Sequence, residues 1–213
     1  FDLFADTLRA TDEYGALQAS FADSNAVQIE QVEANTTECL SNAAYRDSLQ
    51  WQSYPLADGV ISQGGGWLAV VPPGDQVSGT LTLRDGRGHG LVRVGESAEV
   101  VLTLDLSARS AAFALLQFEV AANASLTLDT TALDTNGLSW ILSRFTLHEH
   151  ARLTLRQYFA GAGNHRHETH VVMAGSGAQA DLTGAAIGAH QSQRDQQLVM
   201  EHTAPHCNSE QRY

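Results

Sequence analysis

The sequence predicts an all-β fold, specifically a flattened right-handed parallel β-helix with two strands in each turn of about 26–27 residues. Four times an Ala is followed four residues later by a Leu in an apolar-alternating run, at Ala98/Leu102, Ala124/Leu128, Ala151/Leu155 and Ala178/Leu182, so the Ala positions are almost evenly spaced. Within each run the apolar residues recur at every second position, which is the period of a β-strand. A fixed period of this length indicates stacked units, because each unit leaves an apolar face that only its neighbour can bury.

A second apolar stripe precedes each of these Ala residues and predicts the other strand of each turn. Six residues before the Ala, the stripe reads Val92, Phe118, Phe145 and Val172, and Val199 continues it if the next turn is anchored near Pro205. Four residues before the Ala, its companion reads Val94, Val120, Leu147 and Ala174. Like residues stacked on like favour a parallel β-helix, since hairpins would reverse direction within about 8 to 12 residues. An antiparallel sandwich with accidental spacing is the alternative.

The chain before the first regular turn divides near residue 60. Residues 1–60 have little strand character and are predicted to form a partly helical, acidic lead, with candidate helix starts at Thr11 and Asn35. Pro55 and the glycines at 64–66 mark a boundary, after which residues 67–71 are predicted to form the first strand and residues 79–83 an irregular early turn. The β-helix core is thus expected over residues 61–213. It ends at Tyr213 without a polar cap, which predicts a core truncated at its C-terminus.

Composition excludes several classes of protein. A chain of 213 residues with 43% hydrophobic content can bury a core without disulfides. The net charge is −12 and all 12 cations are scattered Arg residues, which argues against a nucleic-acid partner and excludes a P-loop, whose Lys contacts phosphate. The longest apolar stretch, residues 67–73, is far shorter than the roughly 20 residues of a membrane span, so no membrane association is expected. The two cysteines, Cys39 and Cys207, cannot form a disulfide framework, and a cytoplasmic location is predicted.

Histidine is the conspicuous side chain for chemistry, because eight of the nine fall in the last third of the chain. Imidazole and thiolate are ligands that suit zinc, iron and iron–sulfur clusters. The candidate metal ligands are His165, His167 and His170. The candidate cofactor-binding residues are His202, His206 and Cys207. The alternative is that these are ordinary exposed loop residues, and no catalytic residue is predicted.

The interior columns of the predicted β-helix turn polar toward the C-terminus. The column eight residues before each Ala runs Leu116, Ser143, His170 and Gln197, and the column four residues before ends at Glu201. Burying such groups unpaired would cost roughly 1 to 3 kcal/mol each, so they are expected to pair or to line a route through the β-helix. A register slip of one residue would instead turn all of them outward.

The C-terminal segment carries a resemblance to a known family. The pattern Glu201-His202-x-x-Pro205-x-Cys207-x-Ser209-x-Gln211-x-Tyr213, preceded by the glycine-bounded segment 184–188, resembles the core of the SufB/SufD proteins, which are scaffolds of iron–sulfur cluster assembly. The similarity extends back through residues 153–158 and 170–172 to about Trp67, and the family's right-handed parallel β-helix agrees with the repeat. The short lead and the amino-acid sequence of residues 205–211 resemble SufD more than SufB.

This resemblance implies a subunit that is not an enzyme. It would pair with a SufB-like paralogue and a SufC-like ATPase, with a homodimer left open. No firmly bound cofactor is expected, and an iron–sulfur cluster would be held only transiently in the full complex. The family's Cys-Ser-His-Gly segment and its SufC-binding helices are expected downstream of Tyr213. Cys207 is followed by Asn208 and does not match that segment, so a structural role is expected for it.

Two other functions remain open from the sequence. A carbohydrate-active β-helix needs carboxylates clustered on one outer face. Asp105, Asp129 and Asp181 are expected to point outward, but they lie at unequal distances after their Ala, at the seventh, fifth and third positions, and so should not stack. A pure protein-interaction solenoid would need no chemistry at all.

Overall fold

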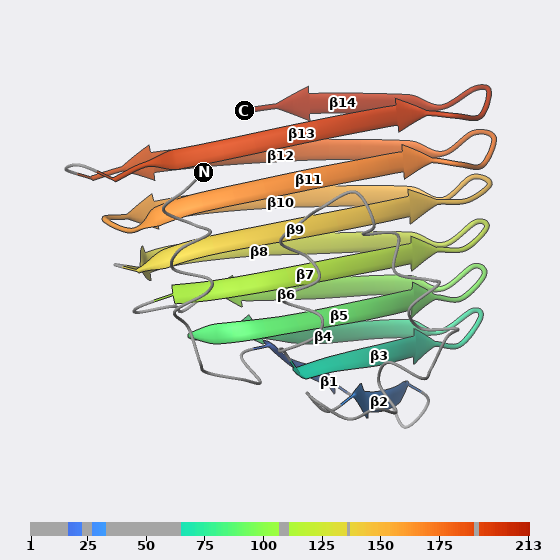
Figure 1. Cartoon of the computed structure of the whole chain (residues 1–213). Helices are drawn as coiled ribbons and strands as arrows, with labels where there is room; N and C mark the ends of the chain where they lie inside the picture. Colours follow the sequence, from blue (N-terminus) through green and yellow to red (C-terminus); the bar gives the residue numbers. More distant parts are fainter. Residues whose placement is uncertain (1–16, 23–26, 33–64, 107–110, 136, 190–191) are drawn as a thin grey trace.

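The computed structural model describes residues 17–22, 27–32, 65–106, 111–135, 137–189 and 192–213, and every regular element in these ranges is a β-strand. Figure 1 shows the strands stacked as two facing layers. The strands are β1 (Leu17–Ala22), β2 (Gln28–Val32), β3 (Gly65–Val71), β4 (Gln76–Leu83), β5 (Gly86–Val94), β6 (Glu99–Leu106), β7 (Ala111–Val120), β8 (Ser125–Thr135), β9 (Leu138–Leu147), β10 (Arg152–Gly161), β11 (Asn164–Met173), β12 (Gln179–Gly188), β13 (Arg194–His202) and β14 (Asn208–Arg212).

The two layers are seven-stranded sheets, which we name sheet I and sheet II. Sheet I has the order β1-β4-β6-β8-β10-β12-β14, and sheet II the order β13-β11-β9-β7-β5-β3-β2. From β3 onward the chain alternates between the sheets, and each strand pairs in parallel with the strand two places later, for example β8 with β10 and β9 with β11. One strand from each sheet makes one coil. This confirms the predicted all-β parallel β-helix with two strands per turn.

The predicted period is also confirmed in the middle of sheet I. Glu99 pairs with Ser125, Ser125 with Arg152, and Arg152 with Gln179, so these pairings advance along the chain in the same steps as the repeated Ala. The first and last coils differ. The step from β4 to β6, which joins Gln76 to Glu99, is shorter, and the step from β12 to β14, which joins Gln179 to Asn208, is longer. The period can be recognised in the sequence because the middle coils are regular. The irregular steps are those of the first and last described coils.

The repeated Ala marks the corner where each coil passes from sheet II to sheet I. Ala98, Ala124, Ala151 and Ala178 are all at most 2% exposed. The residue before each corner position has a positive φ, at Ser97, Asn123, His150, Gly177 and, in the last coil, His206. The left-handed conformation turns the chain sharply, and a small side chain fits inside the corner. The residue after His206 is Cys207, so Cys207 takes the corner position that Ala holds in the four coils before it.

The apolar core lies between the inner faces of the two sheets. Phe118 and Phe145 are 0% exposed and stack with ring centroids 4.8 Å apart and an angle of 7° between the rings. Val92 pairs with Phe118 on one side, and Phe145 pairs with Val171 on the other. The predicted stripe is therefore confirmed as far as Phe145 and is wrong beyond it by one residue.

The register error begins in the turn between β11 and β12, which contains one residue more than the turn before it. Arg152 is the fifth residue after Leu147, whereas Gln179 is the sixth after Met173. The backbone N–H groups of both Ala174 and Gly175 donate to the carbonyl oxygen of Leu147, at 2.8 and 3.0 Å. The extra residue is thus absorbed in the turn, so counting back from Ala178 places β11 one residue out of register. Val171, Met173 and Met200 point inward in place of the predicted Val172, Ala174 and Val199.

Replacing Gly175 with Ala is expected to lower the free energy of unfolding by about 2–3 kcal/mol. A Cβ at this position would lie 2.0 Å from the backbone nitrogen of Glu149 and 2.1 Å from the carbonyl carbon of His148, so the backbone of the neighbouring coil must shift. Urea denaturation followed by circular dichroism measures the loss. The matched control is Gly74→Asn, because a Cβ at Gly74 meets nothing within 4 Å and Asn tolerates its φ of 76°. Equal stability of the Gly175→Ala variant and the wild type would contradict this account of the turn.

The lead was expected to be partly helical, and this is wrong for the two segments of it that the structure describes. β1 pairs antiparallel with β4, and β2 pairs antiparallel with β3, so each extends one sheet at the first coil. Ala19 and Phe21 alternate with exposed polar residues and pack against the core, which is the period of a strand and not of a helix. The candidate helix starts at Thr11 and Asn35 and the boundary near residue 60 lie outside the described residues.

The outer faces of the two sheets differ. On sheet I, β6 alternates strictly between exposed outer residues and buried inner residues. On sheet II, β7 is buried along both faces except at Glu119, and its outer residues Phe113 and Leu115 are at most 1% exposed. A strand buried on both faces reads as a continuous apolar run.

In the ranges that the structure describes, no helix has the length and apolar character needed to cross a bilayer.

Candidate functional site

The interior of the β-helix contains polar residues, with Ser143 inward as predicted but with other residues of β11 and β13 than those predicted. Because β11 is shifted by one residue, Ser143 pairs with Thr169 and Arg144 pairs with His170. His165, His167 and Thr169 point inward and are at most 4% exposed. The predicted inward positions of His170 and Gln197 in one column, and of Glu201 in the other, are wrong, since these residues lie on the outer face of sheet II.

Gln157 of β10 is the centre of the inner polar network and is 0% exposed. Its amide nitrogen donates to His167 Nδ1 at 3.2 Å and to the Thr169 hydroxyl at 3.3 Å. Its amide oxygen accepts from Gln196 at 2.7 Å and from the Tyr213 hydroxyl at 3.3 Å. The network therefore joins the buried interior to the outermost described coil.

Two serines of β9 complete the inner network. His167 Nε2 forms a hydrogen bond with Ser143 Oγ at 3.2 Å, and the Gln157 amide nitrogen lies 3.2 Å from His167 Nδ1 and 3.4 Å from its Nε2. His165 forms a hydrogen bond to Ser139 through Nδ1. Ser139 and Ser143 occupy inward positions where β7 has Ala112 and Leu116, so the serines provide the polar partners that an apolar coil would lack.

Both inner histidines are held neutral. Burial lowers the pKa of His165 to about 4, and the nearby positive charge of Arg194 contributes in the same direction. Burial, with a contribution from His165, lowers the pKa of His167 to about 3. The ring of Phe159 packs against both imidazoles, with centroid distances of 6.2 and 5.5 Å, and helps to exclude water from them.

Arg194 is the inward residue of β13 that pairs with His165. Its Nη2 donates to the carbonyl oxygen of Gly161 at 2.7 Å, while its Nε and Nη1 are buried without a hydrogen-bond partner. Burial lowers the pKa of this guanidinium, although Arg stays charged at any physiological pH. The end of the polar interior is thus positively charged.

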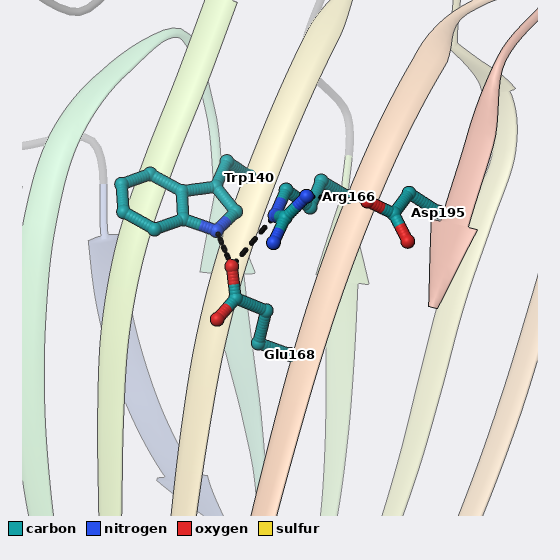
Figure 2. A network of polar contacts seen from close by, with 4 residues as sticks. All are labelled: Trp140, Arg166, Glu168 and Asp195. Carbon is teal, nitrogen blue, oxygen red and sulfur yellow. Dashed lines mark hydrogen bonds and ion pairs between the residues drawn. The ribbon is translucent and has the colours of Figure 1, made fainter. Parts of the chain in front are cut away.

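A second polar network lies on the outer face of sheet II and is shown in Figure 2. Glu168 of β11 is 7% exposed and accepts from Trp140 Nε1 at 3.0 Å and from Arg166 Nε at 2.6 Å. Arg166 also forms an ion pair with Asp195 of β13. Trp140, Arg166 and Asp195 follow one another in register on neighbouring strands, so the network crosslinks β9, β11 and β13.

His170 belongs to this outer face. Arg144 Nη1 donates to His170 Nδ1 at 3.0 Å, so the His170 proton is on Nε2, which donates to Glu201 at 2.9 Å. His165 and His167 point to the interior, and His170 points to the opposite side of the same strand. The structure therefore brings His165 and His167 to one face and does not bring all three candidate metal ligands together.

The candidate cofactor residues His202, His206 and Cys207 lie at and after the end of β13. His202 hydrogen-bonds Ser209 Oγ at 3.1 Å, and His206 is exposed at the left-handed corner position. The Cys207 thiol donates to the carbonyl oxygen of Gly175 at 3.4 Å. Across the described ranges, no three His, Cys, Asp or Glu side chains are grouped in a way that could hold a metal ion.

Replacing Cys207 with Ala or Ser is expected to change the free energy of unfolding by less than about 1 kcal/mol. The reason is its corner position, where the four preceding coils fold with Ala. Chemical denaturation measures the change, with Ala178→Asp at the equivalent buried corner as the destabilising comparison. A loss of more than about 2 kcal/mol in Cys207→Ala would show that the thiol itself supports the turn.

Sequence reasoning missed Gln157, Ser139 and the outer network around Glu168. A Gln at an inward position of the apolar run Leu153–Phe159 was visible as a break in that run, and Trp140 and Glu168 carried no signal in the sequence. The network depends on three strands that lie side by side only once the register is known.

Comparison with known families gives one match. The sequence model of the family described as SUF system FeS cluster assembly, SufBD core domain, matches residues 84–213. This range contains every coil from β5 to β14 and both polar networks. None of the curated proteins compared with the chain matches it.

Proposed function

The chain belongs to the SufBD core domain family of the SUF iron–sulfur system, and from this premise we propose that it is a SufD-like, non-catalytic subunit of the scaffold on which a cluster is assembled. The observation that carries the assembly role is the match over residues 84–213, which spans the coils from β5 to β14 and applies to SufB and SufD alike. The cluster is cargo in this proposal. It is held transiently in the full complex and is not a resident cofactor of this chain.

Two partners complete the proposed complex. A SufB-like paralogue would pair with this chain, and a SufC-like ATPase would supply ATP hydrolysis. The absence of Lys from the sequence supports this division of labour, since the chain has no P-loop Lys with which to contact ATP phosphates. The assignment as SufD-like, not SufB-like, is supported by the sequence from Pro205 to Gln211. The proposed location is the cytoplasm.

The outer face of sheet I gives no support to a carbohydrate-active enzyme. Asp105, Asp129 and Asp181 lie on this face in three different register columns, opposite Thr131, Arg156 and Glu210 respectively. Asp129 is also paired with Arg156 at 2.6 Å. Acid and base groups must converge on one bond, and these three carboxylates do not form such a group.

Co-purification of the chain with SufB-like, SufD-like and SufC-like proteins from one source tests the proposal. Binding of the SufB-like partner, with recruitment of SufC, is the expected result. Pairing only with the SufD-like protein would reassign the chain as the SufB-like member. Binding to none of them would leave a β-solenoid that interacts with other proteins and would overturn the assembly role.

The same reconstituted complex tests the candidate site residues. Cluster formation is followed by its visible absorption after addition of iron and a sulfur donor. Ala variants of His202, His206 and Cys207 are compared with the exposed-residue control His148→Ala. Loss of the absorption with intact complex formation would identify a residue that contacts the cluster.

A further inference from the structure

The inner face of the β-helix changes from apolar to polar along the stack. In β7 the inward residues are all apolar: Ala112, Ala114, Leu116, Phe118 and Val120. In β9 two of the corresponding positions hold Ser139 and Ser143, and in β11 three hold His165, His167 and Thr169. In β13 two hold Arg194 and Gln196. Successive coils therefore bury less apolar surface against one another.

The change from apolar to polar inward residues is confined to one half of each coil. Near the Ala corners the inner face stays apolar through Phe145, Val171 and Met200. In the other half, the inward Ile141 lies in register with His167, and Phe159 packs against both inner imidazoles. The hydrogen bonds there replace bonds to water and so add little net stability, and two guanidinium nitrogens of Arg194 are buried without a partner.

Stacked coils have stabilities that are set by each coil and its nearest neighbours. Coils with polar inward residues are therefore expected to have a lower local stability than coils of the same stack with apolar inward residues. We propose that β11–β14 open together as a unit of lower stability, while the coils from β3 to β10 remain folded. This inference concerns the chain itself and does not depend on the proposed function.

Hydrogen exchange of the full chain, resolved by peptide, tests the proposal. The comparison is between β11 and β7, since each is paired on both sides and neither is at the edge of a sheet. Amides of β11 are expected to exchange at least tenfold faster than those of β7. Their exchange should also depend less on urea, because a partial opening exposes less surface than global unfolding. Equal exchange in the two strands would overturn the proposal.

A quadruple variant, Ser143→Ala, Gln157→Leu, His167→Leu and Thr169→Val, shows whether the polar interior is the cause. It replaces both partners of each hydrogen bond among these four residues with apolar groups of similar size. Gln196 and Tyr213 lose Gln157 as their acceptor, but both are exposed and can donate to water instead. Protection of β11 is expected to rise at least tenfold while that of β7 stays the same. The control Gln179→Leu makes the same chemical change at an exposed outer position of β12 and should alter neither strand. Unchanged exchange of β11 in a folded quadruple variant would overturn the proposal.

Discussion

Replacing Phe145 with Asp is expected to unfold the β-helix. Phe145 is fully buried, stacks on Phe118 and pairs with Val171, so the Asp would place an unpaired charge in the middle of the apolar column. Removing a buried Phe side chain alone costs about 3–5 kcal/mol, and an unpaired buried carboxylate adds to that. The total approaches the whole stability of a typical domain, about 5–15 kcal/mol. Circular dichroism and thermal denaturation of the purified variant measure the effect.

Two variants sharpen this test. Phe145→Leu keeps the position apolar and should lose only part of the stacking, with the fold retained. Thr183→Asp introduces the same carboxylate on the outer face of sheet I, in register between Arg156 and Arg212, and should leave stability nearly unchanged. A Phe145→Asp variant as stable as the wild type would show that the register described here is wrong.

Acid is expected to destabilise the chain through His165 and His167. Their folded-state pKa values, about 4 and about 3, lie below the ordinary value of 6.5, so below pH 6.5 the unfolded chain binds more protons than the folded chain. Stability from this source is fully present above pH 6.5 and is lost as the pH falls toward the folded-state values. Each unit of pH in this window costs about 1.4 kcal/mol for each His, which gives on the order of 3 kcal/mol each between pH 6.5 and 4.

Urea denaturation at several pH values measures this loss. The double variant His165→Asn with His167→Asn keeps hydrogen-bonding side chains but removes the titration, so its stability should fall less steeply across the same pH window. His148→Asn removes an exposed imidazole and should leave the slope as in the wild type. The same slope in the double variant and the wild type would mean that the inner histidines are not held neutral by burial.

Much of the fold follows from local pattern. Alternation along runs such as Leu126, Leu128 or Leu153, Leu155 fixes which side of a strand faces inward, because successive side chains point to opposite faces. The recurring Ala marks a tight corner, because only a small side chain fits inside it. These features are properties of short segments and can be read from the sequence without knowing what lies beside them.

The lead shows where such reading fails. Ala19 and Phe21 lie in a short segment that carries little strand signal by itself, and β1 is a strand because β4 offers it a partner along its whole length. An isolated short strand is not stable, so its presence depends on pairing and not on its own composition.

At the candidate site, too, some features follow from the local sequence and others depend on how the strands pair. The residue pattern alone predicts a stack of two-stranded coils, a core that runs through Phe118 and Phe145, and polar residues that enter the interior toward the C-terminus. Which polar residues point inward depends on the strand register in the folded chain. A single extra residue at Gly175 is absorbed in a turn, so His165, His167 and Thr169 point inward and His170 points outward. The physical reason is that a strand alternates with a period of two: a shift of one residue reverses every side chain on it, and the length of a turn is set by the backbone of the neighbouring coil.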